Sequence, residues 1–186
     1  MAYIDVIGYD RAEGELKEIY DDLIQSRGKL ADVHTIQSLN PKSIVNHMDL
    51  YMTIMFGKSP LKRVQREMIA VVVSKNNDCD YCQLHHAEAV NHYWKNATKT
   101  EQLKSDFEQL DLSPIDMELC RFAKNLTCDP NHDNQASTQT LGNLGLSDRA
   151  ILDATLVIAY FNFVNRIVLG LGVAVSEEEL KGYNYD

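Results

Sequence analysis

Hydrophobic residues recur at helical spacing along most of the chain, and no stretch of strand length alternates between apolar and polar residues. Only 4 prolines and 9 glycines interrupt this pattern, so the sequence predicts an all-α fold. No linker or shift in composition divides the chain, and we expect one helical domain over residues 1–186. The periodicity places helices at residues 10–26, 41–57, 60–76, 79–95, 98–110, 114–127, 135–144 and 147–171.

Turn-forming and capping residues support these helix ends. Pro41 and Pro114 stand where a proline is tolerated in a first helical turn, while Gly57 and Gly145 suit helix C-termini. The Ser147 hydroxyl can accept a hydrogen bond from the first free amides of the last long helix. The predicted boundaries therefore have physical causes that are independent of the hydrophobic pattern.

The most apolar run of the chain, residues 154–175, is expected to be a core helix. It carries Asn162, Asn165 and Arg166, which a helix facing lipid would place in hydrocarbon at a large energetic cost. The first residues lack a basic segment followed by a long apolar stretch, so no secretory signal is expected and the cytoplasm is the predicted location.

The charge balance bears on the kind of partner. The chain has 18 Lys and Arg against 27 Asp and Glu, a net charge of -9. Such a charge opposes broad electrostatic binding to nucleic-acid phosphates or to anionic membranes. We therefore expect a small molecule or another protein as partner, and neither a nucleic acid nor a membrane.

Candidate chemistry is concentrated in residues 66–90, "REMIAVVVSKNNDCDYCQLHHAEAV". Two helices are expected here, joined by a tight turn in which Asn76 or Asn77 ends the first helix and Asp78 caps the second. Cys79 then lies in the first turn of the second helix, where the positive end of the helix lowers the pKa of a thiol.

The spacing of Cys79, Cys82 and His86 puts all three on one stripe of the second helix. His86 is four residues beyond Cys82, so its imidazole can accept the thiol proton and later return a proton to a leaving alkoxide. Glu67 lies about 12 to 14 Å down the first helix from the turn and His86 about 10 Å down the second, so the two can meet in an antiparallel hairpin. A carboxylate there can orient the imidazole, although helix periodicity alone allows Glu67 equally well to be a solvated surface residue.

Other readings of the cysteines remain open at this point. Cys79 and Cys82 could be an inert buried pair, or they could bind zinc together with Cys128 and His132. Cys120 is expected in the core and Cys128 as a free thiol in a turn. The remaining histidines have no matched partner in the sequence and are expected to be structural or solvated: His34, His47, His85, His92 and His132. In the run "YFNFVN", residues 160–165, we expect the amides to tie down a neighbouring loop or to lie at a subunit interface.

The residues Glu67-x11-Cys79-x2-Cys82-x3-His86 resemble the signature of the alkylhydroperoxidase D-like group within the carboxymuconolactone decarboxylase superfamily. Residues 36–74 and 147–173 look like its branch of peroxidase-related enzymes, so the resemblance covers most of the chain. It implies an all-helical bundle with the Cys-x-x-Cys on a central helical hairpin. It also implies peroxide reduction by a dithiol without metal or haem, an external thiol reductant, and a homo-oligomer such as a trimer or hexamer.

By position, Cys82 resembles the peroxidatic cysteine of that group, Cys79 the resolving cysteine, and Glu67 with His86 the proton relay. One residue departs from the pattern, because Tyr81 stands where the group has a histidine directly before the second cysteine. A phenol can donate a hydrogen bond but is a poor base at pH 7. We therefore expect Tyr81 in the site and slower or differently tuned peroxide turnover.

The resemblance predicts a thiol-dependent peroxidase that acts on hydroperoxides. Two other functions use the same residues or the same fold. A general thiol-disulfide oxidoreductase or redox sensor would use the dithiol with little peroxidase turnover. A non-redox, decarboxylase-like activity would have no use for the dithiol, which argues against it.

Overall fold

The computed structural model describes residues 2–175, and every regular element within that range is a helix. The all-α prediction is therefore confirmed. In chain order the elements are the 3₁₀-helix η1 (Tyr9–Arg11), α1 (Gly14–Arg27), α2 (Asp32–Thr35), α3 (Pro41–Tyr51), the π-helix η2 (Met52–Phe56), α4 (Arg63–Asn76), α5 (Asp80–Trp94), α6 (Ala97–Asp106), the 3₁₀-helix η3 (Phe107–Gln109), α7 (Pro114–Cys128), α8 (Asn134–Asn143) and α9 (Asp148–Leu171).

Each helix expected from the periodicity is present, with differences at several ends. The first helix begins at Gly14 instead of residue 10, because residues 9–11 form a separate 3₁₀ turn. Helix α4 begins at Arg63 instead of residue 60, and Gln65 Oε1 accepts a hydrogen bond from the Lys62 amide at this end. The four-residue helix α2 was missed, since one helical turn is too short to show a hydrophobic period.

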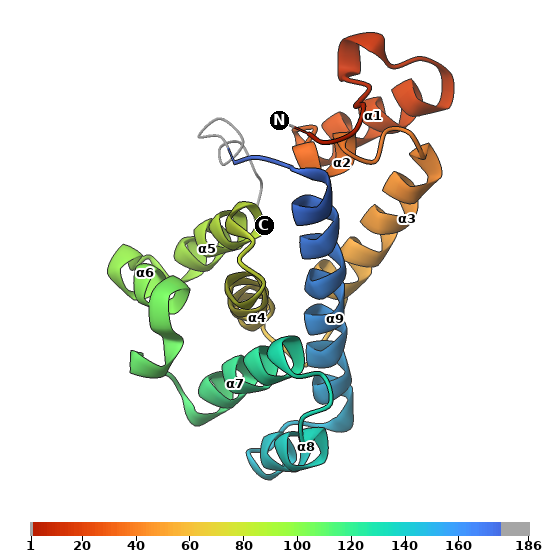
Figure 1. Ribbon diagram of the computed structural model, residues 1–186. Coiled ribbons are helices and arrows are strands. Elements are labelled where there is room, and N and C mark those ends of the chain that lie inside the picture. The colour runs from red at the N-terminus through yellow and green to blue at the C-terminus, as the bar shows by residue number, and fades with distance from the viewer. Residues whose placement is uncertain (1, 176–186) are drawn as a thin grey trace.

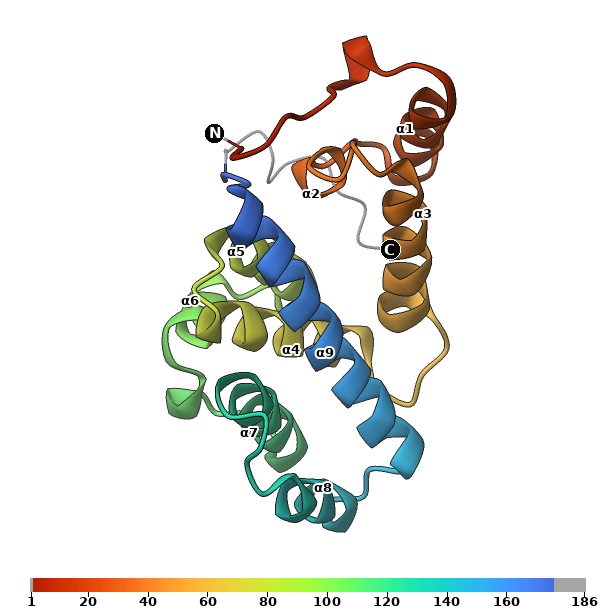
Figure 2. The same cartoon turned by 45° about the vertical axis from the view of Figure 1, so that its right-hand side comes forward.

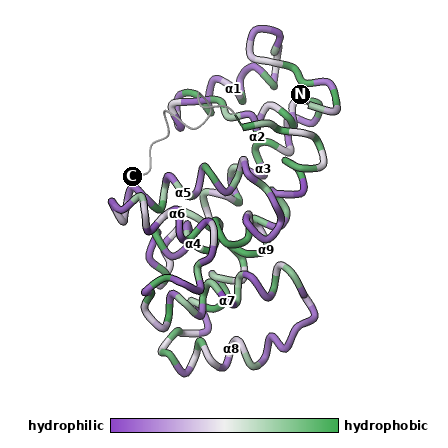
Figure 3. Tube along the Cα trace, turned by 60° about the vertical axis from the view of Figure 1, so that its left-hand side comes forward, coloured by the Kyte–Doolittle hydropathy of each residue, from purple (hydrophilic) through white to green (hydrophobic). Residues whose placement is uncertain are grey.

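Helix α4 is the centre of the fold. It packs against α5, α6, α7 and α9, and Figures 1 and 2 show it enclosed by these helices. Its run from Arg66 to Ser74 is entirely buried, which explains why the sequence there is almost continuously apolar. In Figure 3 the hydrophobic stretches gather around α4 and α9. The predicted hairpin is the pair α4 and α5, and its turn spans residues 77–79.

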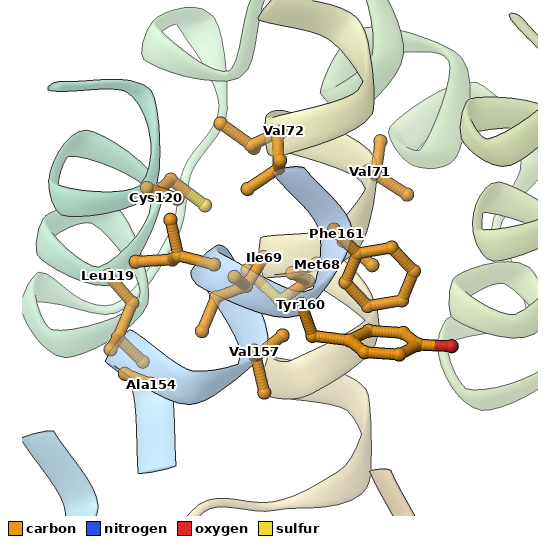
Figure 4. Close-up of a cluster of buried hydrophobic side chains, with 14 of the residues drawn as sticks. Met68, Ile69, Val71, Val72, Leu119, Cys120, Ala154, Val157, Tyr160 and Phe161 are labelled. Atoms are coloured by element: carbon orange, nitrogen blue, oxygen red, sulfur yellow. The ribbon is translucent and has the colours of Figure 1, made fainter. Parts of the chain in front are cut away.

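Helix α9 closes the other side of this core. Val157, Ile158 and Phe161 are buried against α4 and α7, and Figure 4 shows their neighbours on all three helices. Among the described helices, α9 alone is long and apolar enough to span a membrane. Its Asp153 and Asn165 are nonetheless buried and hydrogen-bonded inside the protein, as expected of a core helix.

The N-terminal helices form a separate layer with a small apolar cluster of its own. Leu16, Tyr20 and Leu23 of α1 pack against Ile44 of α3, apart from the main core. The Tyr20 hydroxyl donates a hydrogen bond to the Ile7 carbonyl at 2.9 Å, which fastens the leading segment to α1. In Figure 2 this layer stands beside α9, opposite α7 and α8.

A buried arginine joins the end of the π-helix to α4. Arg66 donates hydrogen bonds to the carbonyls of Ile54, Met55 and Gly57 through Nη1 and to that of Leu61 through Nη2, at 2.8 to 3.2 Å. A π-helix leaves carbonyls without their usual helical partners, and the guanidinium satisfies them. Arg66 therefore fixes the connection that leads into the hairpin.

Gly57 at the end of this connection offers a test of the packing. A Cβ at residue 57 would lie 2.3 Å from the Thr53 carbonyl oxygen, so Gly57→Ala must shift backbone. We expect Gly57→Ala to lower the free energy of unfolding by about 1 to 3 kcal/mol in urea denaturation. Gly142→Ala is the matched control, because Gly142 lies in a helix and a Cβ there meets nothing within 4 Å. Equal stabilities of the two variants would contradict the close approach.

Candidate active site

The turn between α4 and α5 positions Cys79 at the N-terminus of α5. The prediction that Asp78 caps α5 is wrong, because Asp78 has a left-handed backbone with φ 53° and Cys79 itself is the N-cap residue. Asp78 takes this conformation because α4 runs on to Asn76 and the chain must reverse within three residues. Cys82 lies in the first turn of α5, and Cys79 and Cys82 are both buried free thiols.

Side-chain amides from α9 hold this turn. Asn77 Nδ2 donates hydrogen bonds to Asn162 Oδ1 at 3.1 Å and to Asn165 Oδ1 at 2.9 Å. Asn165 Nδ2 donates in turn to Ser74 Oγ at 3.2 Å, and Asn165 is fully buried. The expectation that these amides tie down a neighbouring loop is confirmed, and the loop is the one that precedes Cys79.

The two thiols form one coupled pair. Their Sγ atoms are 3.1 Å apart. A hydrogen bond from the Cys82 thiol, helped by the Cys82 amide, holds the pKa of Cys79 below its ordinary value despite burial. The same hydrogen bond, together with burial, raises the pKa of Cys82 well above its ordinary value. The thiolate is thus favoured on Cys79, at the N-terminus of α5. This agrees with the prediction from the sequence that Cys79 is the more acidic of the two thiols.

Glu67 is a fully buried carboxylate with two partners. Its Oε2 lies 2.6 Å from His86 Nδ1, so the meeting of the two residues in the hairpin is confirmed. Its Oε1 accepts hydrogen bonds from Arg63 Nε at 2.7 Å and Nη2 at 2.5 Å. Burial alone would raise the pKa of Glu67, but His86 and Arg63 outweigh it and the pKa lies below its ordinary value. The alternative of a solvated surface glutamate is wrong.

The contact with Glu67 assigns the proton on His86. An ionised carboxylate can only accept hydrogen bonds, so His86 Nδ1 must be the protonated nitrogen. His86 Nε2 is then the nitrogen left to accept a proton from another group. The His86 ring is held in place by an edge-to-face contact with Phe161, with ring centroids 4.4 Å apart.

A cavity of about 100 Å³ lies against these residues. Cys82, His86 and Glu67 line it, whereas Cys79 does not. The walls are mostly apolar or aromatic, and they come from α3, α4, α5, α9, the end of α1 and the segment around α2. The N-terminal layer therefore supplies part of the wall of the cavity that Cys82 lines.

Tyr81 also lines this cavity, as expected, and is buried. Its hydroxyl accepts a hydrogen bond from the Val33 amide at 3.4 Å, and its ring makes an edge-to-face contact with His85 at 4.4 Å. Tyr81 thus connects α5 to the segment around α2. Its part in catalysis stays a prediction.

Two groups of site residues escaped the sequence analysis. Arg63 could have been found from its position four residues before Glu67, which is the spacing of an ion pair on one helix face. His47 is buried in the cavity wall and hydrogen-bonded between Gln37 and Tyr160, in agreement with a structural histidine, but the sequence analysis did not find these partners. Tyr160 is 113 residues away in the chain, so no local pattern could have paired the two.

The zinc alternative finds no support in the described part of the chain. Over residues 2–175, no group of three or more His, Cys, Asp or Glu side chains is arranged to hold a metal ion. Cys128 is exposed at the end of α7, where its thiol donates a hydrogen bond to Asn76 Oδ1 at 3.3 Å.

The lowered pKa of Glu67 predicts a pH-dependent contribution to stability. The ionised form is favoured by folding, so its contribution is present above the unfolded carboxyl pKa of 4.5 and is lost as the pH falls through the lower folded value. At pH 7 we expect Glu67→Gln to have a free energy of unfolding in urea about 1 to 3 kcal/mol below that of the wild type. This difference should shrink near pH 3. Glu88→Gln, at an exposed position of α5, is the control. A gap that does not change with pH would contradict the ion-pair assignment.

The coupled thiols should ionise in two separate steps. In a background in which Cys120 and Cys128 are both replaced by Ser, thiolate absorbance at 240 nm is expected to show one step below the ordinary thiol pKa and a second step well above it. Cys82→Ala removes the hydrogen bond that chiefly lowers the pKa of Cys79, so the first step should move upward. A single step for both thiols at the ordinary value would show that they are not coupled.

Residues 46–93 match the model of the carboxymuconolactone decarboxylase family. No curated protein matches the chain. A solved uncharacterized peroxidase-related protein from Silicibacter sp. TM1040 has 25% sequence identity and a TM-score of 0.85, over 96% of this chain and 94% of that one. A second, described as an alkylhydroperoxidase AhpD core from Ralstonia eutropha JMP134, has 20% identity, a TM-score of 0.85 and the same coverage, 96% and 94%.

The fold also occurs in a protein with a different activity. The debrominase Bmp8, solved in complex with 2,3,4-tribromopyrrole, has 17% identity and a TM-score of 0.78, over 96% of each chain. The matched segment contains Glu67, Cys79, Cys82 and His86, and the structural likeness extends over the remaining helices. Residues 46–93 are thus similar to the carboxymuconolactone decarboxylase family, and the chain shares the fold of the alkylhydroperoxidase D-like structures.

Proposed function

We propose that the protein is a thiol-dependent peroxidase that reduces organic hydroperoxides with the Cys79 and Cys82 dithiol. One observation carries the proposal: Cys82 and His86 line the same cavity, and His86 is oriented by a buried carboxylate at 2.6 Å. A nucleophile, a base and a residue that orients the base form the arrangement that activates a thiol. The mostly apolar walls favour an organic peroxide of small size.

Cys82 is the attacking residue in this proposal. The acidity of the pair favours Cys79, but Cys79 does not line the cavity and its exposed fraction is 1%. A substrate in the cavity reaches Cys82 first, and the thiol proton of Cys82 can pass to His86 Nε2, from which the leaving alkoxide later takes it. Access to the cavity therefore makes Cys82 the attacking residue, and the more acidic Cys79 acts as the resolving cysteine.

The cycle conserves atoms and electrons. The Cys82 thiolate attacks the terminal oxygen of ROOH, the O–O bond breaks, and the leaving alkoxide takes the proton from His86 to give ROH. Cys82 is now a sulfenic acid, oxidised by two electrons. Cys79 attacks its sulfur and releases water, which leaves a Cys79–Cys82 disulfide. An external dithiol reduces this disulfide by exchange and restores both thiols.

The proposal extends to the reductant, the oligomeric state and the cellular location of the protein. The reductant is a dithiol protein or small molecule, and no further cofactor takes part in the proposed cycle. A homo-oligomer, trimeric or hexameric, is supported by an exposed apolar face along α9 that includes Leu152, Leu156 and Phe163. Residence in the cytoplasm fits a dithiol that must be kept reduced.

Thiol counting after rapid mixing with tert-butyl hydroperoxide tests the proposal. We expect the wild type to lose two thiols per chain, and Cys79→Ser to stop at a sulfenic acid that a dimedone probe traps. Cys82→Ser should not react quickly, and His86→Ala and Glu67→Gln should react about 10² to 10⁴-fold more slowly, since each impairs the proton transfer. Cys120→Ser is the matched control, because its buried thiol has a raised pKa and lies outside the cavity.

Two results would count against a peroxidase. If peroxide leaves all thiols intact while low-molecular-weight disulfides oxidise the pair, the protein is a disulfide exchanger. If peroxide oxidises the pair once and no dithiol donor restores turnover, it is a redox sensor.

A further inference from the structure

Among the polar groups of the cavity wall that the proposed cycle does not use is the hydroxyl of Tyr160. Tyr160 of α9 lines the cavity together with Cys82, and its hydroxyl lies 2.6 Å from His47 Nε2 of α3. His47 Nδ1 lies 2.8 Å from Gln37 Nε2, in the segment that follows α2. Three residues from separate parts of the chain thus form one hydrogen-bonded row that ends at the cavity.

The direction of every hydrogen bond in this row can be assigned. Gln37 Nε2 lies 2.8 Å from the Val33 carbonyl oxygen, which can only accept, so this end of the amide is the NH₂ group. The NH₂ group therefore also donates to His47 Nδ1. His47 is neutral, because burial lowers its pKa to about 4, and its proton must then be on Nε2. His47 Nε2 donates to Tyr160 Oη.

A tyrosine oxygen that accepts this hydrogen bond still has its own O–H to donate. Burial, with smaller contributions from Tyr51 and Cys82, raises the pKa of Tyr160 well above its ordinary value, so the hydroxyl stays protonated. Figure 4 shows the ring at the edge of the buried aliphatic cluster, with the oxygen pointing away from those side chains. Among residues 2–175, no group accepts a hydrogen bond from this O–H. The free proton is therefore available to a molecule in the cavity.

Resting on the peroxidase function above, we propose that Tyr160 is a catalytic residue that donates a hydrogen bond to the leaving oxygen of the hydroperoxide. Cys82 attacks the terminal oxygen, and charge develops on the other oxygen as the O–O bond breaks. A donor already fixed in place stabilises that charge without reorganisation at the moment of reaction. His86 still supplies the proton that converts the alkoxide to ROH, so Tyr160 gives a hydrogen bond and keeps its own proton.

His47 and Gln37 are positioning residues in this proposal. Their hydrogen bonds occupy one side of the Tyr160 oxygen and so turn its O–H toward the cavity. The ring is braced by Phe161 and Tyr51, whose centroids lie 5.0 and 5.8 Å away. The N-terminal layer thereby takes part in the site, because it supplies Gln37 and His47.

The test uses two oxidants with different leaving groups. Tert-butyl hydroperoxide expels a strongly basic alkoxide that needs stabilisation, whereas peroxyacetic acid expels a weakly basic carboxylate that needs little. We expect Tyr160→Phe to slow oxidation of Cys82 by tert-butyl hydroperoxide about 10²-fold and by peroxyacetic acid only a few-fold. His47→Leu should show the same selectivity with a smaller loss. Tyr20→Phe, which removes a buried hydroxyl outside the cavity, should change neither rate.

The outcomes separate this proposal from the function on which it rests. An equal loss with both oxidants would overturn the role of Tyr160 and leave a structural one, with the peroxidase intact. Unchanged rates in Tyr160→Phe would overturn it as well. A wild type that reacts with neither oxidant would remove the peroxidase function, and the role of Tyr160 would go with it.

Discussion

The hairpin is organised by a carboxylate that has no access to water. Glu67 lies one turn from the start of α4, the central helix of the fold, and its exposed fraction is 0%. A buried charge without partners costs several kcal/mol, so the fold must bring cationic or proton-donating groups to it. Arg63, in the preceding turn of α4, donates to Glu67 Oε1. His86 of α5 donates to Glu67 Oε2. The pairing with His86 joins α5 to α4, and His86 also lines the cavity.

The sequence predicts this part of the molecule well because its contacts are local in the chain. Glu67 and His86 belong to adjacent helices joined by a tight turn, so counting residues from the turn is enough to bring them together. The same reasoning failed at Asp78, where capping preferences alone could not tell which residue the short reversal would force into a left-handed backbone. Arg63 could also have been predicted from residue spacing, because it lies four residues before Glu67 on the same helix, but the sequence analysis did not include it.

The opposite wall of the cavity could not be read from the sequence. Gln37, His47 and Tyr160 come from three elements, and only tertiary packing sets them in a row. The sequence predicted that the amides of Asn162 and Asn165 in α9 would hold a loop, because amides at helical spacing beside aromatic residues commonly do so. Which loop they secure depended on the packing of α9 against α4. Periodicity therefore gives the helices and the local motif, whereas the shape of the substrate site comes from long-range contacts.

The N-terminal layer covers the cavity but is held by a much smaller apolar cluster than the core beneath it. Local opening costs least where few apolar side chains are buried. Sub-global unfolding of α1 and α3 would expose the cavity while α4, α5 and α9 stay folded. The layer over the cavity is therefore the part of the described chain where local opening costs least, and the reactive side chains beneath it belong to the larger cluster.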